Sequence, residues 1–240
     1  MQVETIVPLI TGASRGIGGE LVRAWIERGV RKIYVTARNP FELELLPSSD
    51  AIIHVMALDI TNDANARQVA AHASDVNVLI NNAGSMCPGH AVETGADTIR
   101  ADMETNFFGT LNAVRAFAPV LARNRPSAIL NILSISALAS SPAAAGYSAS
   151  KAATHSLTQA LRADLSVDGI SVHGAFPGPV ETEMTAGLEM TKASPSETAD
   201  AIVDGLLNGE EDIYPDRMAR QVAAMWSKNP KILEKQLAMI

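Results

Sequence analysis

Short apolar runs alternate along the chain with longer segments whose apolar residues recur every three or four positions. The short runs are rich in β-branched residues and end at polar residues, glycine or proline, which is typical of buried strands. We predict seven strands, at 5–10, 32–38, 51–58, 76–80, 127–133, 170–176 and 212–215. The longer segments predict helices at 19–29, 62–73, 96–123, 147 to about 169, and 196–208. This alternation predicts an α/β fold of the Rossmann type, with a doubly wound, mainly parallel seven-stranded sheet flanked by helices.

Two places conflict with these patterns. Pro8 lies in the first strand and has no N–H to donate, so we expect that strand to begin late or to leave one neighbouring carbonyl unpaired. Asn106 and Gly109 lie inside the 96–123 pattern, although both residue types have poor helix propensity. We therefore expect a local distortion there that exposes a carbonyl or an amide.

Composition and charge narrow the class of protein. The 240 residues are 47% hydrophobic and no linker divides them, so we expect a single domain over 1–240. The net charge of -7 argues against nucleic acid or an anionic membrane as a partner. Without a long apolar run or a basic signal-peptide start, we expect a cytoplasmic protein. The single cysteine, Cys87, excludes an internal disulfide, and the five histidines are not clustered, which predicts no catalytic metal.

The first strand runs into a glycine-rich turn, Thr11-Gly-Ala-Ser-Arg-Gly-Ile-Gly18, which precedes a helix. Glycines there permit a tight turn and let backbone N–H groups approach a pyrophosphate at the helix N-terminus. The Gly-x-x-x-Gly-x-Gly spacing differs from the commonest dinucleotide fingerprint and from the Walker loop. The turn therefore predicts nucleotide binding, and a glycine-rich turn that binds no ligand is the alternative.

Charged residues at the next strand ends bear on the choice of cofactor. Roughly 20 residues past the glycine turn, an NAD site would carry Asp or Glu against the ribose hydroxyls, whereas an arginine accommodates the extra phosphate of NADP. This chain has Ala37 and Arg38 there, and Arg15 in the turn, which favours NADP(H) unless both arginines are simply solvated. Asp59 ends the third strand, where it either binds an adenine amino group or caps the following turn.

Two further turns are expected at the same edge of the sheet. The turn 81–84, Asn-Asn-Ala-Gly, follows the fourth strand, and its small and amide residues let a cofactor approach closely. The turn 177–182 follows the sixth strand. After it, the segment 180–195 carries apolar Met184, Leu188 and Met190 among polar residues, which suits a lid over a substrate.

A serine, a tyrosine and a lysine follow the fifth strand. Tyr147 and Lys151 are four residues apart, about 6 Å along a helix axis and on one face. Lowering the pKa of a tyrosine from ~10 by roughly three units takes about 4 kcal/mol, which a lysine and a cationic nicotinamide could supply together. Tyr147 could contact a carbonyl group of a substrate, and Ser134 would donate a hydrogen bond to the same carbonyl oxygen. For the Tyr147 and Lys151 pair alone, the alternative is a buried tyrosine beside an exposed lysine.

Taken together, these motifs resemble the short-chain dehydrogenase/reductase family over nearly the whole chain. The matching residues are Thr11-Gly-x-x-x-Gly-x-Gly18, Asn81-Asn-Ala-Gly84, Asn106, Ser134, Tyr147-x-x-x-Lys151, and Pro177-Gly178 with Thr182. Ser134 matches rather than Ser136, because the family pattern asks for thirteen positions before the tyrosine. Pro8 and Leu133 depart from the pattern, and neither departure removes a reacting group.

The resemblance implies a role for each motif. Tyr147 would transfer the proton, while Lys151 would lower the pKa of Tyr147 and hold the nicotinamide ribose. Ser134 would orient the carbonyl, Asn106 would support a water relay, and Thr182 would contact the carboxamide. The cofactor-binding residues that we predict are Gly12, Ser14, Arg15, Gly16, Ile17, Gly18, Arg38, Asp59, Ile60, Asn82, Ala83, Gly84, Tyr147, Lys151, Pro177, Gly178, Val180 and Thr182.

The resemblance also implies the reaction, a reversible hydride transfer between NADPH and a ketone or aldehyde carbonyl. The segments expected to line the substrate are 85–92, 136–145 and 184–190; apart from His90 they are mostly small or apolar, which favours a neutral, hydrophobic substrate. One alternative is a ketoreductase of the 3-oxoacyl-carrier-protein type, against which the acidic surface argues mildly. A second alternative is an NADP(H)-binding redox sensor without catalysis. Members of the family commonly form dimers or tetramers, so the resemblance implies a homodimer or homotetramer.

Overall fold

Seven parallel strands form one sheet in the computed structural model, which describes residues 2–40 and 50–238. Their order across the sheet is β3-β2-β1-β4-β5-β6-β7, so the chain winds outward in one direction and then crosses over to wind in the other. The strands are β1 (Pro8–Ile10), β2 (Lys32–Ala37), β3 (Ile52–Ala57), β4 (Val78–Asn81), β5 (Ser127–Ile132), β6 (Ile170–Ala175) and β7 (Asp212–Ile213). The predicted α/β fold and doubly wound sheet are confirmed.

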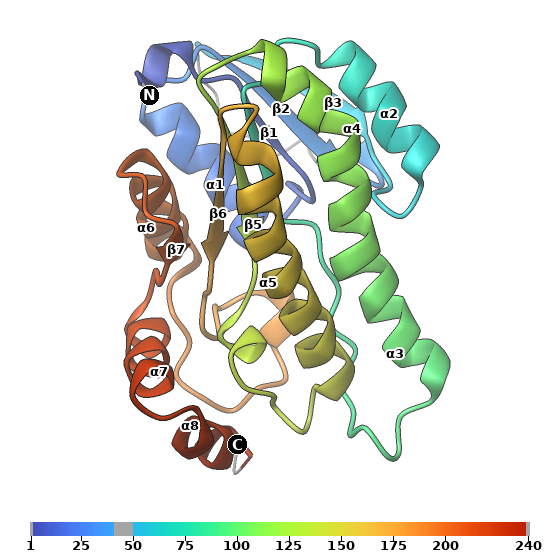
Figure 1. Ribbon diagram of the computed structural model, residues 1–240, viewed down its shortest axis with the longest axis vertical. Helices are drawn as coiled ribbons and strands as arrows, with labels where there is room; N and C mark the ends of the chain where they lie inside the picture. Colours follow the sequence, from blue (N-terminus) through green and yellow to red (C-terminus); the bar gives the residue numbers. More distant parts are fainter. Residues whose placement is uncertain (1, 41–49, 239–240) are drawn as a thin grey trace.

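Helices cover both faces of this sheet (Figure 1). They are α1 (Gly16–Glu27), α2 (Asp63–His72), α3 (Ala96–Met103), α4 (Thr110–Arg123), α5 (Ala145–Ser166), α6 (Pro195–Leu207), α7 (Arg217–Lys228) and α8 (Pro230–Leu237). One core of buried apolar residues joins α1 and α6 to the sheet, and a second joins α2, α4 and α5 to the other face. In Figure 1 the strands run between α1 and α6 on the left and α4 and α5 on the right.

The first strand begins at Pro8, later than the predicted start at Thr5, because Val3–Thr5 forms a short 3₁₀ turn. The Asn77 side chain supports this entry into the sheet. Its Oδ1 accepts from Val7 N at 2.8 Å, and its Nδ2 donates to Thr5 O at 2.9 Å. The proline therefore opens the strand, where its missing N–H is tolerated.

The 96–123 pattern is not one regular helix. A π-helical turn at Glu104–Gly109 separates α3 from α4, so the distortion expected at Asn106 and Gly109 is confirmed. A Cβ on Gly109 would lie 2.6 Å from Ile60 Cδ1, so the glycine lets this turn pack closely against the segment that follows β3. Single π-helical turns often occur at functional sites, and here the turn carries the buried Asn106.

The C-terminal part of the chain, predicted only as a closing tail, is the helical pair α7 and α8. Apolar residues of both helices pack against Ile135, in the 3₁₀ turn Ile135–Ala137 that follows β5, and Leu233 is fully buried there. Asp216 is the N-cap of α7, and Pro230 is the first residue of α8. Both residue types are common at helix starts, so these two positions indicate two helices. Within residues 2–40 and 50–238, none of the helices is both long enough and apolar enough to cross a membrane.

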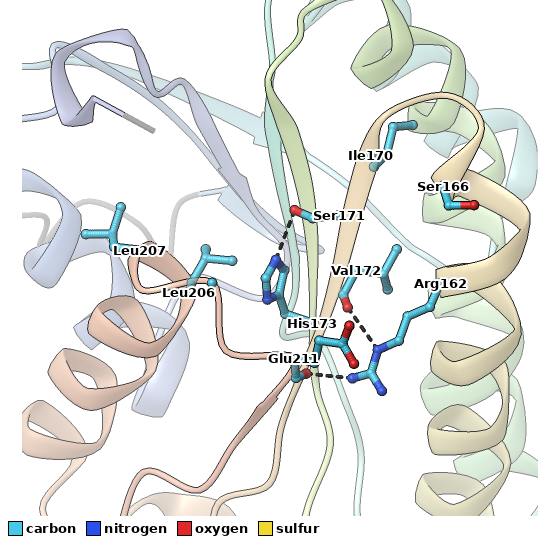
Figure 2. Close-up of a pocket in the computed structure, with 10 residues that line it drawn as sticks. Arg162, Ser166, Ile170, Ser171, Val172, His173, Leu206, Leu207 and Glu211 are labelled. Carbon is cyan, nitrogen blue, oxygen red and sulfur yellow. Dashed lines mark hydrogen bonds between the residues drawn. The ribbon is translucent and has the colours of Figure 1, made fainter.

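A cavity of about 410 Å³ lies beside the first residues of β6, between the ends of α5 and α6 (Figure 2). Arg162 crosses it from α5 to the edge of the sheet. Its Nε donates to Val172 O at 3.0 Å, and its Nη2 donates to Asp212 Oδ1 at 2.6 Å. The guanidinium therefore joins β6 to the first residue of β7.

His173 lines the same cavity and is only 5% exposed. Its Nδ1 lies 2.6 Å from Glu210 O, an acceptor, so Nδ1 carries the proton. Its Nε2 lies 2.9 Å from Ser171 Oγ, within hydrogen-bonding distance. Burial of the ring favours its neutral form.

His173 should make the protein less stable in mild acid. Burial lowers the pKa of its imidazole, although the Glu210 carbonyl works in the opposite direction. Because the folded pKa lies below the unfolded value of about 6.5, the unfolded state takes up the proton first, and stability falls as the pH drops below ~6.5. Urea unfolding should show a smaller loss of stability between pH ~6.5 and ~5 in His173→Phe than in wild type.

Exposed His72, on α2, supplies the matched control, because the same change to phenylalanine there removes a ring that is not buried in the fold. His72→Phe should leave the acid-induced loss unchanged. His155 is half-buried and its pKa is also lowered by burial, so part of the loss should remain in His173→Phe. An unaltered pH dependence in that variant would contradict the assignment.

Candidate active site

The glycine turn and the 81–84 turn are joined at the carboxyl ends of β1 and β4. The Thr11 hydroxyl accepts hydrogen bonds from Asn82 N and Ala83 N, both at 3.0 Å. The Asn82 side chain completes the contact, because its Nδ2 donates to Gly12 O at 2.8 Å and to Thr11 O at 3.0 Å. Two turns that were predicted separately therefore form one braced unit, and the Asn82 amide serves that bracing.

Glycines in this unit allow close backbone contacts that a side chain would prevent. Gly12 has a positive φ of 64°, and a Cβ there would lie 2.8 Å from Ala83 Cα. A Cβ on Gly18 would lie 2.2 Å from Gly12 O. Arg15, the residue before α1, makes no side-chain capping bond, so N–H groups of the first helical turn remain for an anion. This cradle fits the pyrophosphate of a dinucleotide.

The charged residues expected near the adenosine lie at the neighbouring strand ends. Arg38 is exposed just after β2, and no ion pair to it is seen among residues 2–40 and 50–238. Arg15 is also exposed, and its Nη1 lies 3.2 Å from Glu183 Oε2. Asp59 Oδ1 accepts from Thr61 N at 2.9 Å and from the Thr61 hydroxyl at 2.7 Å, so the capping role is seen and the adenine contact stays a prediction.

The turn after β6 lies against the glycine turn. A Cβ on Gly16 would lie 3.1 Å from Thr182 Cγ2, which brings the start of the predicted lid over the cradle. Gly178 N donates to Asp216 Oδ2 at 2.7 Å, and Asp216 Oδ1 accepts from Ala219 N at 2.8 Å. One buried carboxylate therefore fixes both the Gly178 backbone and the start of α7.

Tyr147 and Lys151 lie in the first two turns of α5, which begins at Ala145, and share one face as predicted. Lys151 Nζ lies 5.7 Å from the centroid of the Tyr147 ring. The lysine is 5% exposed, and its Nζ donates to Ile132 O at 2.8 Å, at the end of β5. The alternative of an exposed lysine is therefore wrong.

Burial shifts the pKa of both groups in the chain alone. Burial raises the pKa of the Tyr147 phenol, Ser134 lowers it, and the charge of Asp102 raises it further. Burial lowers the pKa of Lys151 to about 8, and the charge of Asp102 opposes that fall. The chain alone therefore holds a protonated tyrosine, and the lowering of its pKa by Lys151 together with a nicotinamide stays a prediction.

Asn106 is 1% exposed and links three parts of the site. Its Oδ1 accepts from Ser85 N at 2.9 Å, and its Nδ2 donates to Ser150 Oγ at 2.8 Å. Its backbone oxygen accepts from the hydroxyls of Thr110 at 2.7 Å and Thr154 at 3.0 Å. A water relay through that carbonyl, as the resemblance implies, would have to share it with two hydroxyls.

Three polar residues of this region were not predicted: Asp102, Thr154 and Asp216. Asp216 had a detectable signal, since Asp after proline and before an amphipathic segment is a helix N-cap. Asp102 and Thr154 had none, because an isolated polar residue on a helical pattern normally belongs to the solvated face. In the structure both are buried, at 0% and 2% exposure.

Two of the segments expected to line the substrate run side by side. Gly89 N donates to Ala143 O at 2.7 Å, and a bridge joins Gly89 to Ala144, so 85–92 lies along 136–145. From the third segment, the side chains of Met184 and Leu188 are exposed, at 44% and 39%. Within the described residues, no group of three or more His, Cys, Asp or Glu has the arrangement of a metal site.

Comparison with known proteins relates this geometry to other chains. The family model described as short chain dehydrogenase matches residues 6–193. An uncharacterized oxidoreductase of Staphylococcus saprophyticus is 28% identical over 218 residues, which cover 86% of this chain and 93% of the relative.

Solved structures resemble the chain over almost its whole length. A short chain dehydrogenase from Burkholderia cenocepacia in complex with NADP has a TM-score of 0.92 and 37% identity, and 99% of each chain is covered. A short chain dehydrogenase/reductase from Burkholderia phymatum in complex with NAD has a TM-score of 0.87 and 22% identity over 98% of this chain and 96% of the other, a likeness of fold alone. The same architecture thus carries either dinucleotide.

Two adjacent glycines test the close packing of the cradle. Gly18→Ala should lower the free energy of unfolding by about 1–3 kcal/mol, because its Cβ would press on Gly12 O and on Asn82 Nδ2 at 2.4 Å. Gly19→Ala is the matched control, since its Cβ would meet nothing nearer than Ala13 O at 3.7 Å and alanine is the better helix former. Chemical unfolding of both variants measures the difference between their free energies of unfolding. Equal free energies would show that the turn can move to accommodate a Cβ at Gly18.

Proposed function

The chain belongs to the short-chain dehydrogenase family, and we propose that this oxidoreductase is an NADP(H)-dependent carbonyl reductase that interconverts a ketone or aldehyde with its alcohol. The observation that carries the proposal is the position of the reacting groups. Ser134, Tyr147 and Lys151 come together at the carboxyl end of β5, at the same sheet edge as the glycine cradle. Parallel strands collect ligands at that edge.

In this proposal the chain's own residues handle the proton and the developing charge, and bound NADPH supplies the hydride. Ser134 is close enough to Tyr147 to lower the pKa of its phenol, and in this proposal one carbonyl oxygen accepts from both hydroxyls. As negative charge grows on that oxygen, Tyr147 gives up its proton and Ser134 stabilises the charge. Lys151, held by Ile132 O, keeps a positive charge close to the resulting phenolate.

The raised pKa of Tyr147 sets its protonation state in the chain alone. The phenol keeps its proton at neutral pH, which is the form that reduction requires, whereas oxidation of an alcohol needs a phenolate that can accept a proton. The lysine, with a pKa of about 8, is still mainly cationic at neutral pH. The ground state of the chain alone therefore suits proton donation.

The preference for NADP(H) rests on charge at the end of β2. Exposed Arg38 lies where a carboxylate would meet the ribose hydroxyls of NAD, and Ala37 before it is uncharged. The Burkholderia cenocepacia relative, whose structure holds NADP, supports this choice. Arg15 is a second candidate for the phosphate, although it would have to leave Glu183 to reach it.

For the substrate we propose a neutral, fairly hydrophobic carbonyl compound, received between the paired segments 85–92 and 136–145 and covered by the lid at 180–195. The apolar side chains of Met184 and Leu188 on the lid support this class. A screen of NADPH oxidation over ketones, aldehydes and acyl thioesters tests it. Turnover of ketones or aldehydes supports the proposal, preference for acyl-carrier thioesters would favour the ketoreductase alternative, and binding of NADPH without any turnover would favour a sensor.

Tyr147→Phe should keep NADPH binding while lowering kcat roughly 10²- to 10⁴-fold, because the substituted ring fills the same space but carries no proton. NADPH fluorescence titration and steady-state rates measure the two effects separately. Retained turnover in the phenylalanine variant would remove Tyr147 as the proton donor.

Arg38→Asp should weaken NADPH binding roughly 10- to 100-fold, because it replaces a charge-assisted phosphate contact with a repulsion, and it should leave NADH binding much less affected. Arg31→Asp, an identical charge change at the exposed residue before β2 and at the opposite end of that strand, is the matched control. An unchanged ratio of the two dissociation constants would refute the phosphate assignment.

A further inference from the structure

Asp102 is a carboxylate that the proposed reaction does not use. It lies in the last turn of α3 and is 0% exposed. Its Oδ1 accepts from the Ser85 hydroxyl at 2.8 Å, and Cys87 N donates to both carboxylate oxygens, at 3.2 and 3.3 Å. Among the described residues no lysine, arginine or histidine nitrogen lies within ion-pair distance of it. A buried charge with only neutral partners is costly, so its position needs an explanation.

The other side of this carboxylate faces the start of α5. A Cβ on Gly146 would lie 3.4 Å from Asp102 Oδ2, so the carboxylate packs against the helical turn that holds Tyr147. The N-terminus of a helix carries partial positive charge and favours a nearby anion. Asp102 therefore connects the segment after the 81–84 turn to the helix that bears the proton donor.

The titratable groups that face Asp102 come from two other elements. Cys87 follows the 81–84 turn, and Tyr147 and Lys151 lie on α5. The charge of Asp102 raises the pKa of both the Cys87 thiol and the Tyr147 phenol, and it opposes the fall of the Lys151 pKa. On its own helix, Asp97 and Arg100 are paired at 2.7 Å on the exposed side, away from this contact.

We propose that Asp102 is a positioning residue of the active site, whose buried carboxylate holds Ser85 and Cys87 against the start of α5 and places a negative charge beside the helical turn that carries Tyr147. The bonds from the Ser85 hydroxyl and Cys87 N orient the carboxylate, and its other oxygen packs against Gly146 in the first turn of α5. This inference rests on the proposed function for its catalytic meaning. The electrostatic part stands without it.

The consequence for catalysis is a shift in pH dependence. A carboxylate beside the first turn of α5 favours the protonated forms of its neighbours, so Tyr147 keeps its proton to a higher pH. Removing the charge would make the phenolate easier to form. Oxidation of the alcohol would then reach its full rate at a lower pH, and reduction would begin to fail at a lower pH.

The test is an ultraviolet titration of tyrosinate in the full-length protein without cofactor or substrate. Subtracting the titration of the matching Tyr147→Phe protein isolates Tyr147 from Tyr34 and Tyr214. Asp102→Asn keeps the shape and removes the charge, and it should lower the apparent pKa of Tyr147 by about one unit. Asp97→Asn, the same change on the exposed side of α3, should leave it unchanged.

Each outcome decides the proposal. A Tyr147 titration that is the same in Asp102→Asn and wild type overturns it, even if catalysis is impaired, because a purely structural role does not move a protonation equilibrium. If Asp102→Asn does not fold, Asp102→Ser removes the same charge and the same outcomes decide, because burial alone also raises the Tyr147 pKa and the wild-type value cannot separate the two causes. Since no turnover is measured, failure of the proposed carbonyl reduction would leave this result intact.

With an active substrate in hand, the rates add a second measurement. The pH profiles of reduction and oxidation should both move about one unit toward acid in Asp102→Asn. Ser85→Ala removes one hydrogen bond and keeps the charge, so it should change KM while leaving the pH profiles in place. A shift of equal size in Ser85→Ala would assign the effect to the loop rather than to the carboxylate.

Discussion

The parallel direction of the seven strands is the constraint on which the site depends. Parallel strands must be joined by connections that cross over a face of the sheet, and every carboxyl end opens at the same edge. The glycine turn, the 81–84 turn, Ser134 and Gly178 are far apart in the sequence and meet only because of this rule. Two backbone N–H groups of the 81–84 turn then donate to the Thr11 hydroxyl, which fixes the glycine turn and the 81–84 turn relative to each other.

Polar groups inside the fold hold the reacting helix in place. Asn81 Nδ2 donates to Asn131 Oδ1 at 2.8 Å, and Asn131 Nδ2 donates to Thr158 Oγ1 at 2.9 Å, so a chain of side chains runs from β4 through β5 to α5. Buried polar atoms cost about 1–3 kcal/mol when they lack partners. Such a network therefore specifies one position for α5, and with it the position of Tyr147 and Lys151.

Much of this arrangement could be predicted from local patterns. The strand and helix periodicities predicted the sheet. The weak helix formers Asn106 and Gly109 predicted a local distortion, which is a π-helical turn in the structure. The patterns could not predict which charged side chains are buried, nor the direction of the Tyr147 pKa shift in the chain alone. Nothing in an isolated sequence distinguishes Asp102, fully buried, from Asp97, fully solvated, five residues earlier, because their surroundings are set by α5 and by the 85–87 segment. The pKa of Tyr147 depends on that same burial and that same charge, so spacing to a lysine could not fix its direction.

The short β7 has a consequence at the outer side of the sheet. With only Asp212–Ile213 pairing to Gly174 and Ala175, the first residues of β6 pair with β5 on one side and have no neighbouring strand on the other side within the described chain. An open strand edge is a template on which a second polypeptide can add and start an aggregate. Arg162 occupies the Val172 carbonyl at that edge with a bulky cation, so the side chain that fastens α5 to the sheet also protects the protein against self-association through exposed strands.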